Sequence, residues 1–458
     1  MNRIFLTVSL VSFAAVAADP KVDSAAVSFE YAGDISPAVI TYTLTGAPAV
    51  VTVDIQTNVS ASGSGAWVSV GGVSMGELKG DANRVVRTLD RPTKAYWFPS
   101  QDWAHRRVPV GCIRATVTAW PLDCPPDYMS VGLLSPDTTF EVLDSAIRYY
   151  ASTNDLPGGF DDIAYRTTRM LMRKIPAKGV VWLMGSPTRL DDPLNATTND
   201  VAHRVMFTED YYAGVFELTQ GQVEALGFAN ESLYAAATDA KRMPAERLGH
   251  TRFRGALKNY TFVKKGHEVD GASIVGVLRS RTGIADMDLP TEAQWEYACR
   301  AGTETVLPRG LDYSVENLNS VACTLNNRAK VPGCDKTGPR PVGSFRPNDW
   351  GLYDTIGNVW ELCLDLMGTS TTAARDYLPS FKASLAADWA TGGVTVDPRG
   401  ADNASGRIVK RGGSHNERYP DNSSFLRNDG DPEYAAGSSG TVGYIGGRLF
   451  CSVPAAVK

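Results

Sequence analysis

The sequence has few features of a nucleic-acid-binding or membrane-spanning protein. Its formal charge is −5, and Lys and Arg never gather into the basic stretch that phosphate binding requires. Nucleic acid is therefore not an expected partner. Beyond the first residues, no apolar run is long enough for a membrane helix, so no transmembrane segment is expected. At 458 residues the chain exceeds one hydrophobic core, which predicts two domains.

Histidine is also scarce, with five residues in the chain. None of them forms a pair at the i, i+2 or i, i+4 spacing that places two metal ligands on one element. His105, beside Trp103, is expected to be a surface side chain. A structural or surface role is expected for the others, with His415 as the exception because it opens a polar segment discussed below; the remaining histidines are His203, His250 and His267.

The seven cysteines are too scattered for a small disulfide scaffold, and their odd number leaves at least one unpaired. Cys112 and Cys124 cannot pair, because the alternating residues between them predict a strand that carries the chain roughly 26 Å away. Cys323 and Cys334 flank a Pro-Gly turn, and we predict a disulfide between them.

The N-terminus is typical of a secretory signal peptide. Met1 to Arg3 carries a positive charge, an apolar run follows from Ile4 to Ala17, and small residues end it. We assign residues 1–18 to the signal and expect the mature chain to begin at Ala18 or Asp19. No cysteine lies at the cut, which argues against a lipoprotein. The sequence therefore predicts a secreted or periplasmic protein.

Residues 27–140 alternate between apolar and polar side chains, with turn signals at short intervals. This pattern predicts antiparallel strands, and we assign residues 19–154 to an immunoglobulin- or fibronectin-like β-sandwich. Asn154 to Gly159 has the composition of a linker, so we place a boundary near residue 155 and a linker at 155–175. The second domain then covers residues 176–458.

Helices are predicted at three places in the second domain. Thr219 and Thr291 are each followed three residues later by Gln, which is the spacing of a capping box. A third helix is expected between Ala272 and Arg281, before Gly283. After Gly302 helical periodicity disappears, and a long region rich in Gly, Asn, Asp and Pro follows. A stretch of this kind indicates long functional loops.

Six segments of the second domain occur in the order found in one known family, and together they span roughly residues 176–453. They are VWLMGS at 181–186, ELTQGQ at 217–222, LPTEAQWEYA at 289–298, GLYDTIGNVWE at 351–361, RGGS at 411–414 and IGGRL at 445–449. In this order they resemble the formylglycine-generating enzymes, or sulfatase-modifying factors. The resemblance implies an α+β, C-type-lectin-like domain with long irregular loops.

The resemblance also implies where copper chemistry would lie. In active members two cysteines after Arg-Gly-Gly-Ser bind copper and oxidise a substrate cysteine. By position these fall on Glu417 and Asn422. Cu(I) prefers thiolate ligands, which neither side chain can replace. The nearest cysteines along the chain are Cys363 and Cys451. We therefore expect no copper and no formylglycine generation, and name no catalytic residue.

The calcium loop of the family is better preserved. The resemblance places its ligands at Asp354, Gly357, Val359 and Glu361, and such oxygen ligands suit Ca²⁺. We expect a structural calcium ion here. In the alternative, Asp354 caps the turn and Glu361 pairs with an arginine such as Arg448.

Without copper chemistry, a binding role is the leading hypothesis. Residues 416–429 form a polar segment whose composition suits adaptable contacts with a protein or glycan. The predicted ligand-binding residues are His415, Asn416, Glu417, Tyr419, Asn422, Phe425 and Arg427. Variable proteins of diversity-generating retroelements resemble this domain and vary in the same interval. One alternative is an enzyme using Glu417, Asp421 and Asp429 with His415; another is a divergent formylglycine-generating oxidase.

Overall fold

The computed structural model describes residues 18–24, 27–31, 36–58, 60, 64–103, 108–134, 147–185, 203–255, 269–334, 336–368, 393–398, 404–418, 421–430 and 443–453. The signal-peptide assignment, His105, His267 and Tyr419 lie outside these residues. The chain forms two compact units, the first made of Met1–Val70 and Gly76–Cys124 and the second of Gly71–Met75 and Pro125–Lys458. The division thus falls at Cys124 and not near residue 155.

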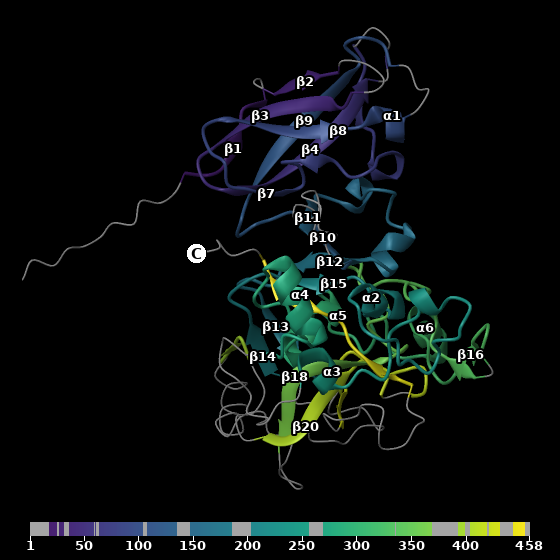
Figure 1. Cartoon of the computed structure of the whole chain (residues 1–458). Coiled ribbons are helices and arrows are strands. Elements are labelled where there is room, and N and C mark those ends of the chain that lie inside the picture. The colour runs from purple at the N-terminus through teal and green to yellow at the C-terminus, as the bar shows by residue number, and fades with distance from the viewer. Residues whose placement is uncertain are drawn as a thin grey trace, which may run out of the picture. The chain divides into compact units, whose positions relative to one another are not determined.

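The first unit contains two antiparallel sheets (Figure 1). In one, β3 (Ala38–Thr45) pairs with β1, β2 and β8, and in the other β4 (Ala49–Asn58) pairs with β9, β5 and β7. Side chains alternate between buried and more exposed along β3 and most of β4, as the sequence predicted. The remaining elements are β1 (Lys21–Val22), β2 (Ser28–Glu30), β5 (Trp67–Ser69), β6 (Lys79–Gly80), β7 (Arg84–Val86), β8 (Pro92–Trp97), α1 (Pro99–Asp102) and β9 (Ile113–Pro121).

The second unit begins with a five-stranded antiparallel sheet in the order β11-β10-β12-β15-β23. Strand β10 pairs with β12 along its whole length, which is why the chain divides before β10. The predicted linker at 155–175 is therefore wrong, because β12 is an inner strand of this sheet. The strands are β10 (Tyr128–Gly132), β11 (Ile147–Tyr150), β12 (Arg169–Ile175), β15 (Tyr211–Gly214) and β23 (Phe450–Ser452).

A four-stranded sheet has the order β21-β20-β18-β22 (Figure 1) and contains parts of the segments at 351–361, 411–414 and 445–449. Its strands are β18 (Trp360–Gly368), β20 (Ala404–Arg411), β21 (Arg427–Gly430) and the parallel strand β22 (Ile445–Gly446). Successive residues of a strand point to opposite faces. The strand register therefore places Glu361, Arg411 and Arg427 on one face. Leu362, Lys410 and Asn428 lie on the other.

The three predicted helices are present. Helices α2 (Gln220–Ala225) and α5 (Glu292–Arg300) both begin with a reciprocal capping box, formed by Thr219 with Gln222 and by Thr291 with Gln294. Helix α4 (Ile274–Thr282) ends at Gly283 in the left-handed region. The other elements are α3 (His250–Arg254), α6 (Val315–Val321), β13 (Val181–Met184), β14 (His203–Met206), β16 (Ala329–Lys330), β17 (Thr337–Gly338) and β19 (Thr395–Val396).

The predicted disulfide is wrong, since Cys323 and Cys334 are both free thiols. Cys323 is buried beside Gly357, with which it forms a parallel bridge, and its Sγ lies 3.8 Å from the carbonyl oxygen of Gly338. Cys334 lies in the turn between β16 and β17, where its N–H donates to Val331. A surface hollow of about 360 Å³, lined by residues 330–334, contains none of the predicted ligand-binding residues.

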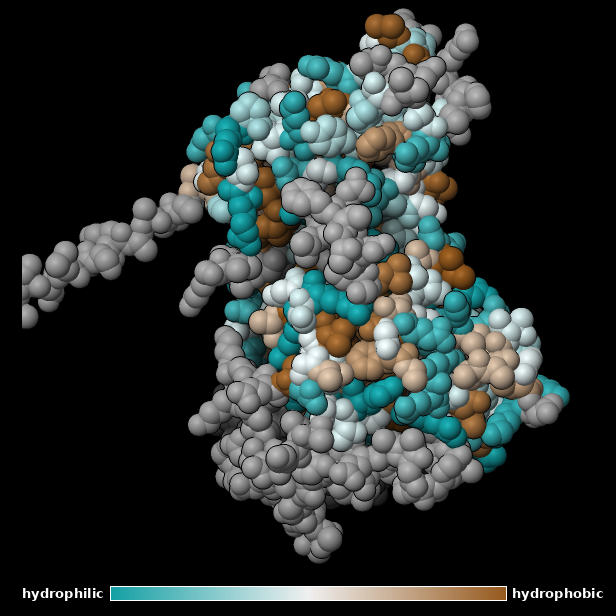
Figure 2. Space-filling view, in the orientation of Figure 1, coloured by the Kyte–Doolittle hydropathy of each residue, from teal (hydrophilic) through white to brown (hydrophobic). Residues whose placement is uncertain are grey.

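The face drawn in Figure 2 mixes hydrophilic and hydrophobic residues in both units. Hydropathy alone therefore does not mark a binding site on the described part of this face, and individual side chains have to be considered. In the described ranges every helix is too short or too polar to cross a bilayer.

Candidate functional site

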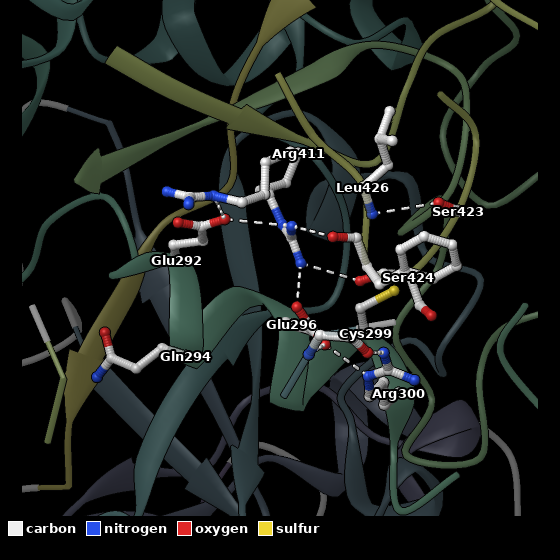
Figure 3. A network of polar contacts seen from close by, with 12 residues as sticks. Glu292, Gln294, Glu296, Cys299, Arg300, Arg411, Ser423, Ser424 and Leu426 are labelled. Atoms are coloured by element: carbon white, nitrogen blue, oxygen red, sulfur yellow. Dashed lines mark hydrogen bonds and ion pairs between the residues drawn. The ribbon is translucent and has the colours of Figure 1, made fainter. Parts of the chain in front are cut away.

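One face of the four-stranded sheet is closed by a buried ionic network with α5 (Figure 3). Arg411 forms ion pairs with Glu292, at 3.2 Å, and with Glu296. The guanidinium of Arg411 also donates to the carbonyl oxygens of Phe425, at 2.6 Å, and Ser424, at 3.0 Å. Arg427 reaches Glu292 at 2.6 Å. The network therefore connects the end of β20 and the start of β21 to α5, a helix more than a hundred residues earlier in the chain.

The electrostatics of this network are those of a structural core. Burial alone would raise the pKa of the Glu296 carboxyl. The positive charges of Arg300 and Arg411 outweigh this effect, so the pKa is lowered. Burial dominates for Glu292 and raises its pKa, although Arg427 and Arg411 act against the rise. Asp365 accepts the N–H of Glu292 at 2.6 Å, and burial together with the charge of Glu292 raises its pKa to about 7.

Glu361 is occupied by protein partners. Arg448 donates to both of its carboxylate oxygens at 2.7 to 3.2 Å, and the indole of Trp295 donates to Oε2 at 2.8 Å. Both side chains are about 1% exposed. The ion pair between Glu361 and Arg448 was one of the two outcomes expected from the sequence, and it is present.

Asp354 differs from Glu361 because one of its oxygens has no partner. Its Oδ2 accepts the N–H of Gly343 at 2.6 Å, whereas the buried Oδ1 makes no hydrogen bond. Burial raises the pKa of Asp354 to about 6. Glu217 is fully buried nearby and accepts from Val359 N–H and the Asn358 side chain. Glu217, Asp354 and Glu361 are thus three buried carboxylates that lie close enough to affect one another's pKa, and only Glu361 forms an ion pair with Arg448.

These contacts show how well the residues present suit the Ca²⁺ ion that the family resemblance implies. The orphaned oxygen of Asp354 and the excess of buried acids are what a Ca²⁺ ligand set requires. Glu361 fits less well, because its oxygens already accept from Arg448 and Trp295. Within the described ranges, no three His, Cys, Asp or Glu side chains are arranged to hold a metal ion by themselves. Calcium at Asp354, Gly357, Val359 and Glu361 remains a prediction.

The sequence analysis predicted that His415 contacts a ligand, but in the structure its side chain is buried. It is 3% exposed, its Nδ1 lies 2.9 Å from the carbonyl oxygen of Asn358, and its Nε2 lies 3.5 Å from the hydroxyl of Tyr234. Burial lowers the pKa of His415 to about 4, so the ring is neutral at ordinary pH. The expected grouping of this histidine with the acids is therefore not supported.

The segment expected to form an exposed polar surface is mostly buried. Asn422, Phe425 and Arg427 are all less than 10% exposed, and Phe425 belongs to the hydrophobic core beside Trp295. The prediction that these side chains form an exposed contact surface is wrong. Arg411 and Arg427 form ion pairs with acids of α5, so the segment between them lies against the core. Only Asn416 and Glu417 remain partly exposed among the described residues that were predicted to bind ligand. The structure does not describe the side chain of Asp429.

Asn422, which stands at the second cysteine position of the resembled family, is fully buried. Neither its Oδ1 nor its Nδ2 has a hydrogen-bond partner. A buried amide of this kind costs free energy comparable to a lost hydrogen bond. Glu417, at the first cysteine position, is partly exposed, and its Oε1 lies 3.5 Å from the indole nitrogen of Trp360.

The opposite face of the sheet carries a small polar group that we call the acidic cluster, made of Lys410, Glu417, Asp421 and Asn428. The Lys410 ammonium lies 4.7 Å from the centre of the Trp360 ring, and Asn428 Nδ2 lies 3.5 Å from Asp421 Oδ1. Burial and the charge of Glu417 raise the pKa of Asp421. All four side chains are partly exposed. A ligand can therefore reach two neighbouring carboxylates here.

The cysteines around the sheet are unsuited to thiolate chemistry. Burial raises the pKa of Cys299 and Cys323 to about 12, and raises those of Cys363 and Cys451 well above the usual range. A reactive thiolate needs a lowered pKa and access. Cys363 packs in the same core as Phe425 and Trp295, on the α5 side of the sheet.

The sequence analysis named Glu417 and Asp421 but missed Lys410, Asn428 and Glu217. Lys410 and Asn428 are direct cross-strand partners in the register of β20 and β21. The strand that contains Lys410 and Arg411 was a usable signal for Lys410, because adjacent residues of a strand point to opposite faces. Glu217 has no local signal, because its role depends on the fold bringing it to Asn358.

Comparisons with known proteins bear on the class of this mainly β-sheet unit. A model of the sulfatase-modifying factor enzyme 1-like domain matches residues 172–443, more than half of the chain. A formylglycine-generating enzyme from Thermomonospora curvata is 32% identical over 130 residues, which are 27% of this chain and 37% of that protein. An inactive C-alpha-formylglycine-generating enzyme 2 from Bos taurus is 41% identical over 80 residues, 16% of this chain and 25% of that protein.

Among solved structures, Treponema denticola variable protein 1 is 20% identical, with a TM-score of 0.42, and the match covers 62% of this chain and 96% of that one. The chain spans little more than a third of the first of the two curated relatives and a quarter of the second. The chain belongs to the family of sulfatase-modifying factor enzyme 1-like domains.

Proposed function

We propose that this protein is an exported, non-catalytic member of its family that binds a ligand at the acidic cluster and does not generate formylglycine. The observation that carries the proposal is the pair of side chains at the two family cysteine positions. Glu417 is a partly exposed carboxylate beside Trp360, and Asn422 is a buried amide. Neither provides the soft sulfur ligand that Cu(I) prefers.

The surrounding thiols support this proposal. Cys363 and Cys451 are the cysteines nearest in sequence to the two positions, and both are buried with raised pKa values. Cys363 packs in the core on the α5 side of the four-stranded sheet, and Cys451 lies on β23 of the five-stranded sheet. Moving such a side chain to the acidic cluster would leave a cavity, which typically costs several kcal/mol.

The ligand is a protein or a glycan, in keeping with a mixed group of acids, an amide and a lysine. Polar side chains that are partly exposed on a rigid sheet can hydrogen-bond a partner without reorganising the fold. Arg328, which binds the Asn416 side chain at 2.6 Å, extends the acidic cluster on one side. We further propose a C-type-lectin-like fold for the second unit, an immunoglobulin-like sandwich for the first, and a structural Ca²⁺ that involves Asp354.

One observation favours an acid/base enzyme as the second candidate. Burial and the neighbouring Glu417 raise the pKa of Asp421, and a partly exposed carboxyl with a raised pKa is a candidate acid/base group. His415 lies apart, against Asn358 and Tyr234, so it does not act with them. Structural ion networks shift pKa values in the same way, and the binding function therefore ranks first.

Binding is tested by screening mature protein on glycan and peptide arrays, followed by titration of the ligands found. The double variant Glu417→Gln/Asp421→Asn removes both charges from the acidic cluster with little change in shape. The matched control, Asp312→Asn/Glu316→Gln, removes two exposed acids near α6. We expect the first variant to lose at least tenfold in affinity and the control to bind as wild type. Equal binding by both would contradict the proposed site.

Export is tested separately by N-terminal sequencing of the protein recovered outside the cytoplasm. The mature chain should begin at Ala18 or Asp19. An N-terminus that still carries Met1 would rule out the signal peptide.

A further inference from the structure

The outer face of the β4 sheet in the first unit carries side chains that, apart from Val50 and Asn58, are partly or fully exposed. On the inner face of β4, Val51, Val53 and Ile55 are buried, so the residues between them point outward. The register of β4 with β9 and β5 defines the outer face. It consists of Val50, Thr52, Asp54, Gln56, Asn58, Trp67, Ser69, Val85, Arg114, Thr116, Thr118 and Trp120.

The polar side chains of this face are held in place by one another. Arg114 Nε donates to Gln56 at 2.9 Å, Gln56 donates to Asp54 at 2.8 Å, and Ser69 donates to the other Asp54 oxygen at 2.6 Å. Arg114 keeps both terminal nitrogens and Gln56 keeps one N–H for further hydrogen bonds. A network fixed in advance loses little side-chain entropy when a ligand binds.

Two tryptophans stand at opposite ends of the same face. Trp67 lies opposite Asn58, and Trp120 lies opposite Val50, so they are separated along β4 by roughly 26 Å. Trp120 donates its indole N–H to Thr52 at 2.8 Å, and Arg114 packs 4.3 Å from the Trp67 ring centre. Both rings are partly exposed. Large rigid aromatic side chains at an accessible surface are typical anchors of binding sites.

The charges of the face select the class of partner. Asp54 and Arg114 are the only ionic side chains among its members, and Gln56 bridges them, so the face has no net charge. Polyanions and polycations gain little from such a surface. A neutral polyhydroxylated chain suits it, because its hydroxyls pair with side chains that both donate and accept and its C–H faces pack on indole rings.

We infer that the outer β4 face of the first unit is a binding site for a neutral polysaccharide, anchored at one end by Trp67 and at the other by Trp120. The distance between the two rings accommodates several sugar units, which places the chain along β4 and across Asp54, Gln56 and Arg114. This site is separate from the acidic cluster and does not depend on the function proposed for it.

The test is affinity electrophoresis of the mature protein in native gels that contain hydroxyethyl cellulose, soluble starch, xylan or galactomannan, with alginate as the anionic arm. We expect retardation in at least one neutral gel. Trp67→Ala and Trp120→Ala should each weaken binding about tenfold. Arg114→Gln, at an exposed position, should weaken it less. Tyr31→Ala, which removes an exposed ring elsewhere in the unit, should bind as wild type.

Thermal melting of each variant separates loss of binding from loss of folding. Variants that melt with wild type but no longer bind support the site. Absence of retardation in every neutral gel, retardation by alginate alone, or wild-type binding by both tryptophan variants would overturn it.

Discussion

The two faces of the β21-β20-β18-β22 sheet differ in how their charges are used. On the α5 face, Arg411, Glu292 and Glu296 are fully buried and joined by ion pairs and hydrogen bonds. On the opposite face Lys410 and Glu417 are partly exposed beside Trp360, and the partly exposed Asp421 lies 3.5 Å from Asn428. The comparison teaches that adjacent residues of one strand can be placed in opposite environments, Arg411 in a buried ionic network and Lys410 at a partly exposed polar surface.

The difference between the two faces is tested most strongly by truncating two adjacent residues of β20, one on each face. Arg411→Ala should lower the free energy of unfolding by about 3–5 kcal/mol, because it leaves Glu296 and Glu292 buried with too few partners. Lys410→Ala on the other face should cost about 1 kcal/mol or less. Chemical denaturation measures both. Similar losses for the two variants would mean that the two faces do not differ as described.

A second prediction concerns pH and Asp365. Its pKa is about 7 in the folded protein, against about 3.9 for an unfolded Asp. Between these values the folded state binds more protons, so the contribution of Asp365 to stability falls as pH rises from 4 to 7. Above pH 7 Asp365→Asn should be more stable than wild type by about 4 kcal/mol, and below pH 4 the difference should disappear.

Unfolding curves from pH 4 to 8 for wild type and Asp365→Asn test this linkage. Subtracting one profile from the other removes the titration of all other groups, including Glu296, whose lowered pKa acts in the opposite direction. A difference that does not change with pH would show that Asp365 is ionised throughout.

A third prediction concerns calcium, which should stabilise the second unit through Asp354. A cation that binds only the folded state at 100 times its dissociation constant adds about 2.7 kcal/mol. Asp354→Asn should remove this gain, while Glu304→Gln, at an exposed acid of the same unit, should retain it. Scanning calorimetry with calcium and with chelator measures the effect. If calcium does not change the melting temperature of wild type, the calcium prediction is wrong and Glu361 and Arg448 form a purely structural pair.

The smallest expected effect concerns Asn422. Its amide is buried without a hydrogen-bond partner, so Asn422→Leu should raise the free energy of unfolding by about 1 kcal/mol. Asn416→Leu is the matched control, since the Asn416 side chain accepts from Arg328 and is partly exposed. That control should be neutral or destabilising. Destabilisation by Asn422→Leu would indicate that the amide has a partner in solution.

Local patterns predicted much of the fold. The capping boxes at Thr219 and Thr291 are present because they depend only on residues three positions apart. The alternation along β3 and β4 was likewise sufficient for these strands. The division of the chain was missed because β10 pairs with β12, a partner that composition does not reveal. The disulfide between Cys323 and Cys334 was inferred from a turn, without the contact that holds Cys323 at Gly357.

The site was predicted less well for a related reason. Polar residues after Arg411 were interpreted as exposed, yet Arg427 pairs with Glu292 and the Ser424 hydroxyl donates to Thr305, both far away in the sequence. Composition records polarity but not where the partners lie. Glu361 shows the same limit, because its motif suits either a cation or Arg448, and only the fold shows the arginine beside it.

The most direct measurement of the central claim is an assay of the purified mature protein, supplied with copper and oxygen, on a peptide containing the Cys-X-Pro-X-Arg sulfatase motif. Mass spectrometry of the peptide distinguishes cysteine from the formylglycine aldehyde. With Glu417 and Asn422 at the two family cysteine positions, the account predicts that the peptide keeps its cysteine. Formation of the aldehyde at multiple turnovers would contradict the account and place this protein among the active oxidases.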